Sequence, residues 1–228
     1  MTFDEVMVWI GENATDKAKQ DMLRYGIPND NACGIPVGVL KKKAKAIGKD
    51  PDLARQLWAA GMYEARTLAA FVHDPDSISR READAWVESF DSWAICDTAC
   101  FHLMDRTPFA WEAIKPWSKS DREFVRRAAY ATIWGLSVHD KSATNGQFQT
   151  ALKLISDAPP DDRPFVKKAV NMALRAIGKR NLVLNAAAIE TANDLMTETS
   201  KDRQWVGRHA LKELTSDKVQ TRLQQKAG

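Results

Sequence analysis

Apolar side chains recur every three or four residues along almost the whole chain, and this spacing constrains the fold more than any other feature. Such residues fall on one face of an α-helix, whereas a half-buried strand alternates apolar and polar residues. The chain has no convincing alternating stretch. The pattern predicts an all-α protein with helices over 3–10, 17–25, 36–47, 52–59, 63–72, 80–88, 92–104, 107–116, 121–137, 146–156, 164–178, 182–196, 202–214 and 217–225.

Three predicted helix starts carry recognisable capping residues. Thr107 followed by Pro108 is typical of an N-cap with proline at the first helical position. Ser120 with Glu123 predicts a capping box, in which the two side chains satisfy each other's backbone N–H groups. Asp91 is expected to cap the helix that follows it rather than to take part in chemistry.

A sequence pattern is repeated in the second half of the chain. The segments EFVRRAAYATIWGL from 123, PFVKKAVNMALRAI from 164 and QWVGRHALKEL from 204 share an aromatic residue and a Val, then basic and small residues. Phe124, Phe165 and Trp205 correspond, at spacings of 41 and 40 residues. This is the length of a HEAT or armadillo-type repeat, a helix pair that buries its face against its neighbours. The pattern predicts a curved α-solenoid of about six HEAT-like helix pairs.

The same reasoning predicts one repeat domain over residues 1–228. Within it, 1–48 holds N-terminal helices, 49–215 the regular repeats, and 216–228 a C-terminal helix or tail. A chain of 228 residues, 44% hydrophobic and 28% charged, is typical of a soluble globular protein.

Composition excludes several function classes. No run of 18 apolar residues is present and the N-terminus lacks a basic segment, so we expect neither a membrane span nor a signal peptide. Three cysteines favour a reducing, cytoplasmic location over a disulfide framework. Cys96, Cys100 and His102 have no second ligand pair, which argues against a metal site. No phosphate-binding loop, dinucleotide motif or serine-hydrolase motif occurs.

Basic residues recur in register with the repeats. Arg127, Lys168 and Arg208 occupy the same position of three successive units. A stripe of cations spaced by one repeat suits a phosphate backbone, and a net charge of +3 permits such a partner. The alternative is that they are solvated charges of the kind every surface helix carries. Periodicity does not separate these two interpretations.

The segment AICDTAC contains one carboxylate, Asp97, inside an apolar run, with Trp93 one helical turn before it. Burying a carboxylate without a charged or hydrogen-bonding partner costs on the order of several kcal/mol. Asp97 therefore either pairs with a cation that fixes repeat packing or faces a groove. Trp93 either faces the same groove or packs in the core, as we expect for Trp58, Trp86, Trp111, Trp117 and Trp134.

The helical repeats, FDSWAICD at 90–97 and FVRRAAY at 124–130 together resemble the AlkD-like DNA alkylation-repair glycosylases. Those enzymes have HEAT-like repeats and excise alkylated purines from DNA. The resemblance runs from about residue 15 to about residue 215. Its central motifs are moderately specific, because a Trp four residues before an Asp gains weight from its place one repeat before the Arg–Ala–Ala run.

The resemblance implies roles for individual residues. Trp93 and Asp97 match the family's Trp and Asp, Arg127 matches its Arg, and Tyr25 matches an N-terminal Tyr. Met172 stands where the family has a second Trp, which leaves room for altered substrate range or for an inactive relative. The residues expected on the DNA backbone are Lys168, Arg208, Arg126 and Lys42. For Tyr25 and for Lys42, core packing and a solvated face are the respective alternatives.

The implied reaction is hydrolysis of the N-glycosidic bond of cationic N3- or N7-alkylated purines, without strand cleavage. Asp97 would stabilise the cationic sugar and orient the attacking water. Trp93 would contact the sugar or the charged base, and Arg127 would hold the phosphate beside the lesion. No metal or other cofactor is implied. The expected partner is double-stranded DNA containing alkylated bases, bound by a monomer.

Two other function classes stay open from the sequence. One is a non-catalytic HEAT-repeat protein that binds damaged or branched DNA, which Met172 slightly favours. The other is a protein–protein scaffold, a common use of α-solenoids. Within the glycosylase hypothesis, both flipping of the base into a pocket and recognition of the duplex backbone are compatible with the residues.

Overall fold

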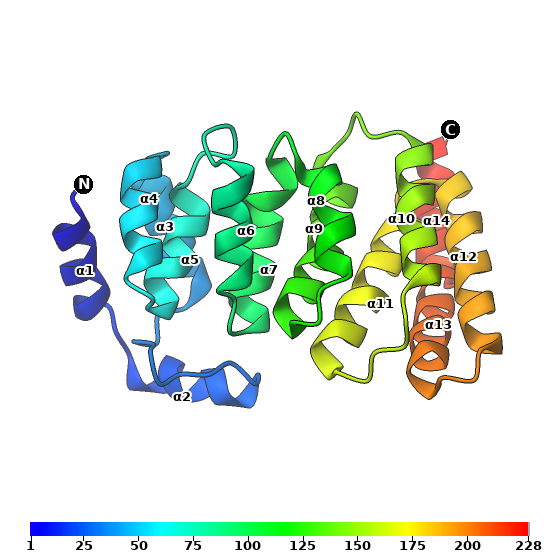
Figure 1. Ribbon diagram of the computed structural model, residues 1–228, viewed down its shortest axis with the longest axis horizontal. Helices are drawn as coiled ribbons and strands as arrows, with labels where there is room; N and C mark the ends of the chain where they lie inside the picture. The colour runs from blue at the N-terminus through cyan, green and yellow to red at the C-terminus, as the bar shows by residue number, and fades with distance from the viewer. Residues whose placement is uncertain (228) are drawn as a thin grey trace. The chain divides into compact units, whose positions relative to one another are not determined.

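The computed structural model describes residues 1–227, and the regular structure in this range is entirely helical (Figure 1). The prediction of an all-helical chain built from successive helix pairs is therefore confirmed. Each predicted helix is present, with ends shifted by at most three residues. The chain divides into two compact units, Met1–Pro108 and Phe109–Gly228.

The first unit pairs helices through large aromatic residues. Its helices α3, α5 and α7 lie side by side, and α4 packs on α5. The rings of Trp58 on α4 and Trp86 on α6 stack with centroids 4.0 Å apart. The elements are α1 (Phe3–Glu12), α2 (Asp16–Arg24), α3 (Val37–Ile47), α4 (Pro51–Ala59), α5 (Tyr63–Val72), α6 (Arg80–Glu88), α7 (Trp93–His102) and the 3-10 helix η1 (Met104–Arg106).

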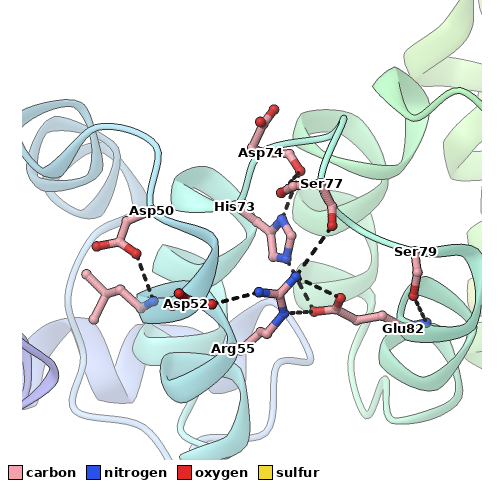
Figure 2. A network of polar contacts seen from close by, with 9 residues as sticks. Asp50, Asp52, Arg55, His73, Asp74, Ser77, Ser79 and Glu82 are labelled. Atoms are coloured by element: carbon pink, nitrogen blue, oxygen red, sulfur yellow. Dashed lines mark hydrogen bonds and ion pairs between the residues drawn. The ribbon is translucent and has the colours of Figure 1, made fainter.

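A polar network joins α4, α6 and the segment between α5 and α6 (Figure 2). Arg55 donates from Nε to Glu82 Oε1 at 3.0 Å and from Nη1 to Asp52 at 2.9 Å. The hydrogen bond to Glu82 raises the pKa of Arg55. The buried ring of His73 lies with Nδ1 2.9 Å from the carbonyl of Asp74 and Nε2 3.3 Å from Glu82. This network fixes the α5–α6 connection that precedes α7.

The second unit has two layers. Helices α9, α11 and α13 pack against one another in sequence, and each also packs against the helix before it. The elements are α8 (Ala110–Ser118), α9 (Glu123–His139), α10 (Asn145–Asp157), α11 (Pro164–Gly178), α12 (Leu182–Thr197), α13 (Lys201–Leu214) and α14 (Asp217–Ala227). Tyr130, Phe148 and Leu174 are among its largest fully buried side chains. Burial raises the pKa of Tyr130 to about 12.

The predicted caps of α8 and α9 are wrong. Helix α8 begins at Ala110, and the Thr107 hydroxyl donates to the Met104 carbonyl at 2.9 Å, so Thr107 closes the η1 turn. Helix α9 begins at Glu123, which places that residue at the first helical position instead of the third. The Ser120 hydroxyl therefore accepts from the backbone N–H of Arg122 at 3.2 Å, two residues on.

The cap of α7 also differs from the prediction. Ser92 is the N-cap, and its hydroxyl accepts from the backbone N–H of Ile95 at 3.4 Å. Asp91, expected in that role, is exposed and pairs with Arg66 at 3.2 Å. A residue further from the helix start cannot reach the backbone N–H groups of the first turn, so Ser92 takes the cap.

Candidate nucleic-acid interface

Helix α7 presents Trp93 and Asp97 from the same face. Trp93 is the first residue of the helix, and Asp97 follows one turn later. Residues four apart in an α-helix are surface neighbours, so the two side chains project in one direction. Both are half-buried, whereas Ile95 and Cys96 between them lie in the core. The buried apolar residues thus anchor α7 in the unit, while the carboxylate of Asp97 lies on the more exposed face of the helix.

The structure brings Trp93 together with Tyr25. The indole Nε1–H of Trp93 donates to the main-chain carbonyl of Tyr25 at 2.9 Å. Tyr25 is the C-cap of α2, and the residue is 69% exposed, so it is not part of the core. The Trp93 ring packs with Tyr63 against a small buried cluster formed by Met22, Ile27, Ala32 and Ala94. Contacts within the first unit thereby fix one edge of the Trp93 indole.

A buried carboxylate holds the loop that follows Tyr25. Glu64 on α5 is fully buried and accepts from the backbone N–H groups of Cys33 at 3.0 Å, Gly34 at 2.7 Å and Ile35 at 3.3 Å. Gly34 has φ +85°, and a Cβ there would lie 2.3 Å from the Thr15 carbonyl, so only glycine fits. Burial raises the pKa of the Cys33 thiol, and the Glu64 charge adds to this.

Lys42 belongs to a lysine-rich hollow on the first unit. The hollow has a volume of about 560 Å³, and its walls include Gly38 and Phe71 together with Lys41, Lys42, Lys45 and Lys49. Lys49 donates from Nζ to the carbonyls of Phe71 at 3.0 Å and His73 at 2.7 Å. Burial and the nearby Arg106 lower the pKa of Lys49. Lys41 and Lys45 are four residues apart on α3 and so share one face of that helix, a spacing that is visible in the sequence, whereas Lys49 lies beyond the end of α3 at Ile47.

In the second unit, the repeated aromatic residues meet at the starts of neighbouring helices. The rings of Phe124 on α9 and Phe165 on α11 have centroids 5.7 Å apart. The Lys167 ammonium lies 5.4 Å from the ring centre of Trp205 on α13. The aromatic residues that match in the sequence repeats thus lie on neighbouring helices, α9, α11 and α13, which pack in that order (Figure 1).

The three basic residues in that register differ in exposure. Lys168 and Arg208 are exposed, whereas Arg127 is only 5% exposed. Arg127 donates from Nη1 to the main-chain carbonyl of Phe165 at 2.5 Å, which ties α9 to α11. The structure therefore offers two exposed cations at this position, and the third serves the packing between two repeats.

Arg126 is engaged within its own unit. Its guanidinium donates to the Ser120 carbonyl at 2.7 Å, to Asp161 at 2.8 Å and to Asp121 at 3.3 Å. Burial alone raises the pKa of Asp161, but hydrogen bonds from Arg163 and Arg126 outweigh it and hold that pKa below its usual value. Because acceptors of the chain occupy its guanidinium, Arg126 would contribute less to the proposed DNA surface than the exposed Lys168 and Arg208.

Met172 lies on α11 one turn after Lys168 and is half-buried. Arg175, which the sequence analysis did not single out, follows it and pairs with Glu213 of α13. Burial opposes ionisation of Glu213, but hydrogen bonds from Lys179 and Arg175 lower its pKa. The exposed side of α11 thus combines a cation, a flexible apolar side chain and an ion pair.

The described residues, 1–227, hold neither a cluster of metal ligands nor a membrane-spanning helix. Within this range no three His, Cys, Asp or Glu side chains gather in a group able to hold a metal ion. None of the helices described is long and apolar enough to cross a membrane.

Comparison with known proteins identifies the family. The model of a family described as DNA alkylation repair enzyme matches residues 9–214. The chain belongs to the DNA alkylation repair enzyme family. A search among curated proteins found no match for this family member.

A solved structure supports the fold assignment. It is described as belonging to "a new family of proteins related to the HEAT-like repeat DNA glycosylases with affinity for branched DNA structures". The similarity has a TM-score of 0.81 at 20% sequence identity and covers 98% of this chain and 96% of the other. At this identity the likeness shows a shared HEAT-like fold for this DNA alkylation repair family member.

Proposed function

We propose that this protein is a DNA glycosylase that removes cationic N3- or N7-alkylated purines from double-stranded DNA. The observation that carries the proposal is the geometry of α7, where Trp93 and Asp97 share one half-exposed face and Tyr25 fixes the indole. Membership of the DNA alkylation repair enzyme family supports the reaction class.

The reaction follows from the charge of the substrate. The C1′–N bond breaks with both electrons passing to the base, whose positive charge is thereby neutralised. The sugar becomes cationic in the transition state, and the carboxylate of Asp97 stabilises it electrostatically. A water molecule then forms the new bond to C1′ and releases a proton, which Asp97 or solvent accepts. The product is an abasic site in an uncut strand.

Trp93 has a separate role in the proposal. Its indole face attracts a cationic base more than a neutral one, an effect worth about 0.5–2 kcal/mol. This preference would select the alkylated purine from its undamaged counterpart. Trp93 is held by the Tyr25 carbonyl, so little freedom of the ring is lost when substrate binds.

Each unit offers exposed cations for the DNA backbone: Lys42 in the first unit, and Lys168 and Arg208 in the second. We also retain Arg127 as the proposed phosphate contact beside the lesion. Because Arg127 is only 5% exposed, it would offer a phosphate only a small part of its side chain. The protein is proposed to act as a monomer.

Release of methylated purines from alkylated duplex DNA tests the proposal. Wild type should release them, and Asp97→Asn should lose most of this activity, on the order of 10²–10³-fold, while keeping DNA affinity. Asp91→Asn is the matched control, because Asp91 is an exposed carboxylate just before the same helix. No release by wild type, or equal release by Asp97→Asn, would contradict the proposal.

A second candidate function is binding of branched DNA without catalysis. Two observations favour it: Met172 replaces the aromatic residue that the family resemblance implies, and the similar structure is described by its affinity for branched DNA. Salt-sensitive binding of a four-way junction in preference to a duplex, without base release, would identify this function. Met172→Trp then tests whether the second aromatic residue restores release.

A further inference from the structure

A second basic hollow lies wholly within the second unit. It has a volume of about 450 Å³ and is formed by the C-terminal ends of α9 and α11 together with α14. Helix α14 follows the last of the repeated segments. The cations that line it are Lys141, Lys179, Arg180, Arg222 and Lys226, and no acidic residue among the described residues lines it.

Neutral groups hold Arg180 in place. Its Nη1 donates to the Ser137 carbonyl at 2.6 Å and its Nη2 to the Asp140 carbonyl at 3.1 Å. The guanidinium carbon lies 4.2 Å from the ring centre of Phe148. Burial lowers the pKa of Arg180, while the charge of nearby Asp140 acts in the opposite direction. These contacts orient the guanidinium without placing a carboxylate against it.

The two acids near the hollow are already engaged. The Asp140 carboxylate accepts from the indole of Trp111 at 3.0 Å and from the backbone N–H of Ala143 at 2.9 Å. Glu213 accepts from Lys179 at 2.7 Å and also pairs with Arg175. Glu213 thus compensates one lining cation, Lys179, and shares its charge with a residue outside the hollow.

Helix α14 contributes the most accessible cations. Arg222 and Lys226 are exposed, and neither has a carboxylate within ion-pairing distance among residues 1–227. Burial lowers the pKa of Lys226, and repulsion from Arg222, Lys141 and Arg180 lowers it further. Three neighbouring cations thus repel Lys226 at this hollow, and a bound anion would relieve that repulsion.

We propose that this hollow binds a phosphodiester group of the DNA backbone, through Arg222 and Lys226 of α14 together with Lys141 and Arg180. The inference rests on the proposed DNA function and adds a contact outside the repeated segments. Trp134, expected in the core, is half-buried here and forms an apolar wall with Val138, which is 39% exposed. A wall of this kind suits the sugar beside a phosphate.

The salt dependence of duplex binding measures the contact directly. Each phosphate contact contributes about 0.9 to the slope of log affinity against log salt concentration. Arg222→Gln/Lys226→Gln should make the slope shallower by about 1 and weaken binding on the order of tenfold in 0.1 M salt. Lys119→Gln/Lys153→Gln is the matched control, because it removes the same charge from exposed positions on or beside α8 and α10. That control should leave the slope unchanged.

The outcomes separate this inference from the proposed function. Base release and duplex binding by wild type, with equal slopes for the two double variants, would overturn the hollow alone. Absence of duplex binding by wild type would overturn the proposed function as well.

Titration with inorganic phosphate, followed by NMR of the arginine side chains, tests whether the hollow binds free phosphate instead of DNA. Phosphate binding with an unchanged DNA slope would assign the hollow to free phosphate and overturn the DNA contact. Thermal unfolding of each variant verifies that it is folded.

Discussion

Asp161 connects the loop before α11 to the start of α9. It accepts from Arg126 at 2.8 Å and from the backbone and side chain of Arg163, with the closest contact at 2.6 Å. The cations around it outweigh the cost of its burial, so its pKa lies below the ordinary value of 3.8. This carboxylate therefore stabilises the fold only while it is ionised.

The sign of the pH dependence follows from that direction. The unfolded chain binds a proton at Asp161 more readily than the folded protein does, so stability from this group is present above about pH 4 and is lost as the pH falls through the lower folded pKa. Asp161→Asn should reduce the free energy of unfolding at pH 6 by about 1–3 kcal/mol. The difference from wild type should shrink as the pH falls below about 4.

Urea unfolding between pH 3 and about pH 7 checks this prediction. Asp162→Asn is the control, because the neighbouring carboxylate is exposed and its replacement should stay within about 0.5 kcal/mol of wild type. A constant difference between Asp161→Asn and wild type over the whole range would contradict the linkage argument.

Helices α12 and α13 depend on a close approach at Gly207. A Cβ at this position would lie 2.4 Å from the Ala192 carbonyl and 2.9 Å from the Met196 side chain. Glycine normally weakens a helix interior by about 1 kcal/mol relative to alanine. Here the absent Cβ lets two backbones pack together, so the local cost is offset by the contact between the helices.

Gly207→Ala should therefore destabilise the protein by about 1–3 kcal/mol despite the better helix propensity of alanine. Gly146→Ala on α10 is the control, since a Cβ there meets only the Thr144 hydroxyl at 3.8 Å. That variant should be as stable as wild type or slightly more stable. Thermal unfolding of both proteins makes the comparison, and equal melting temperatures would contradict the packing explanation.

The domain organisation of the chain is a proposal about all of its helices. We propose that residues 1–228 form one repeat domain, with 1–48 as N-terminal helices, 49–215 as repeats and 216–228 as a C-terminal element. In repeat proteins stability is shared between neighbouring repeats, so a local loss is felt beyond the repeat in which it occurs.

Leu174→Ala tests this proposal, because Leu174 is fully buried on α11 and its truncation should cost about 2–5 kcal/mol. In a single domain, hydrogen exchange should accelerate in helices of both compact units. Leu182→Ala is the control, since Leu182 is 42% exposed at the start of α12. Acceleration confined to residues after 108 would indicate two independent domains.

The positions of the helices could be predicted from the sequence because a helix is largely a local structure. Apolar spacing located each helix, and the aromatic register of Phe124, Phe165 and Trp205 predicted which helices repeat. The caps of α8 and α9 could not be predicted with the same certainty. Several polar residues near each start compete for a few backbone N–H groups, and the surrounding chain determines which one reaches them.

The candidate site shows the same division. The sequence alone predicted that Trp93 and Asp97 share one face, because residues four apart on a helix are neighbours on its surface. The sequence did not predict three other features: the burial of Arg127 against Phe165, the indole contact of Trp93 with Tyr25, and the hollow at Arg222. Each joins segments far apart in the chain, so it exists only once the helices have packed, and no local pattern records that packing.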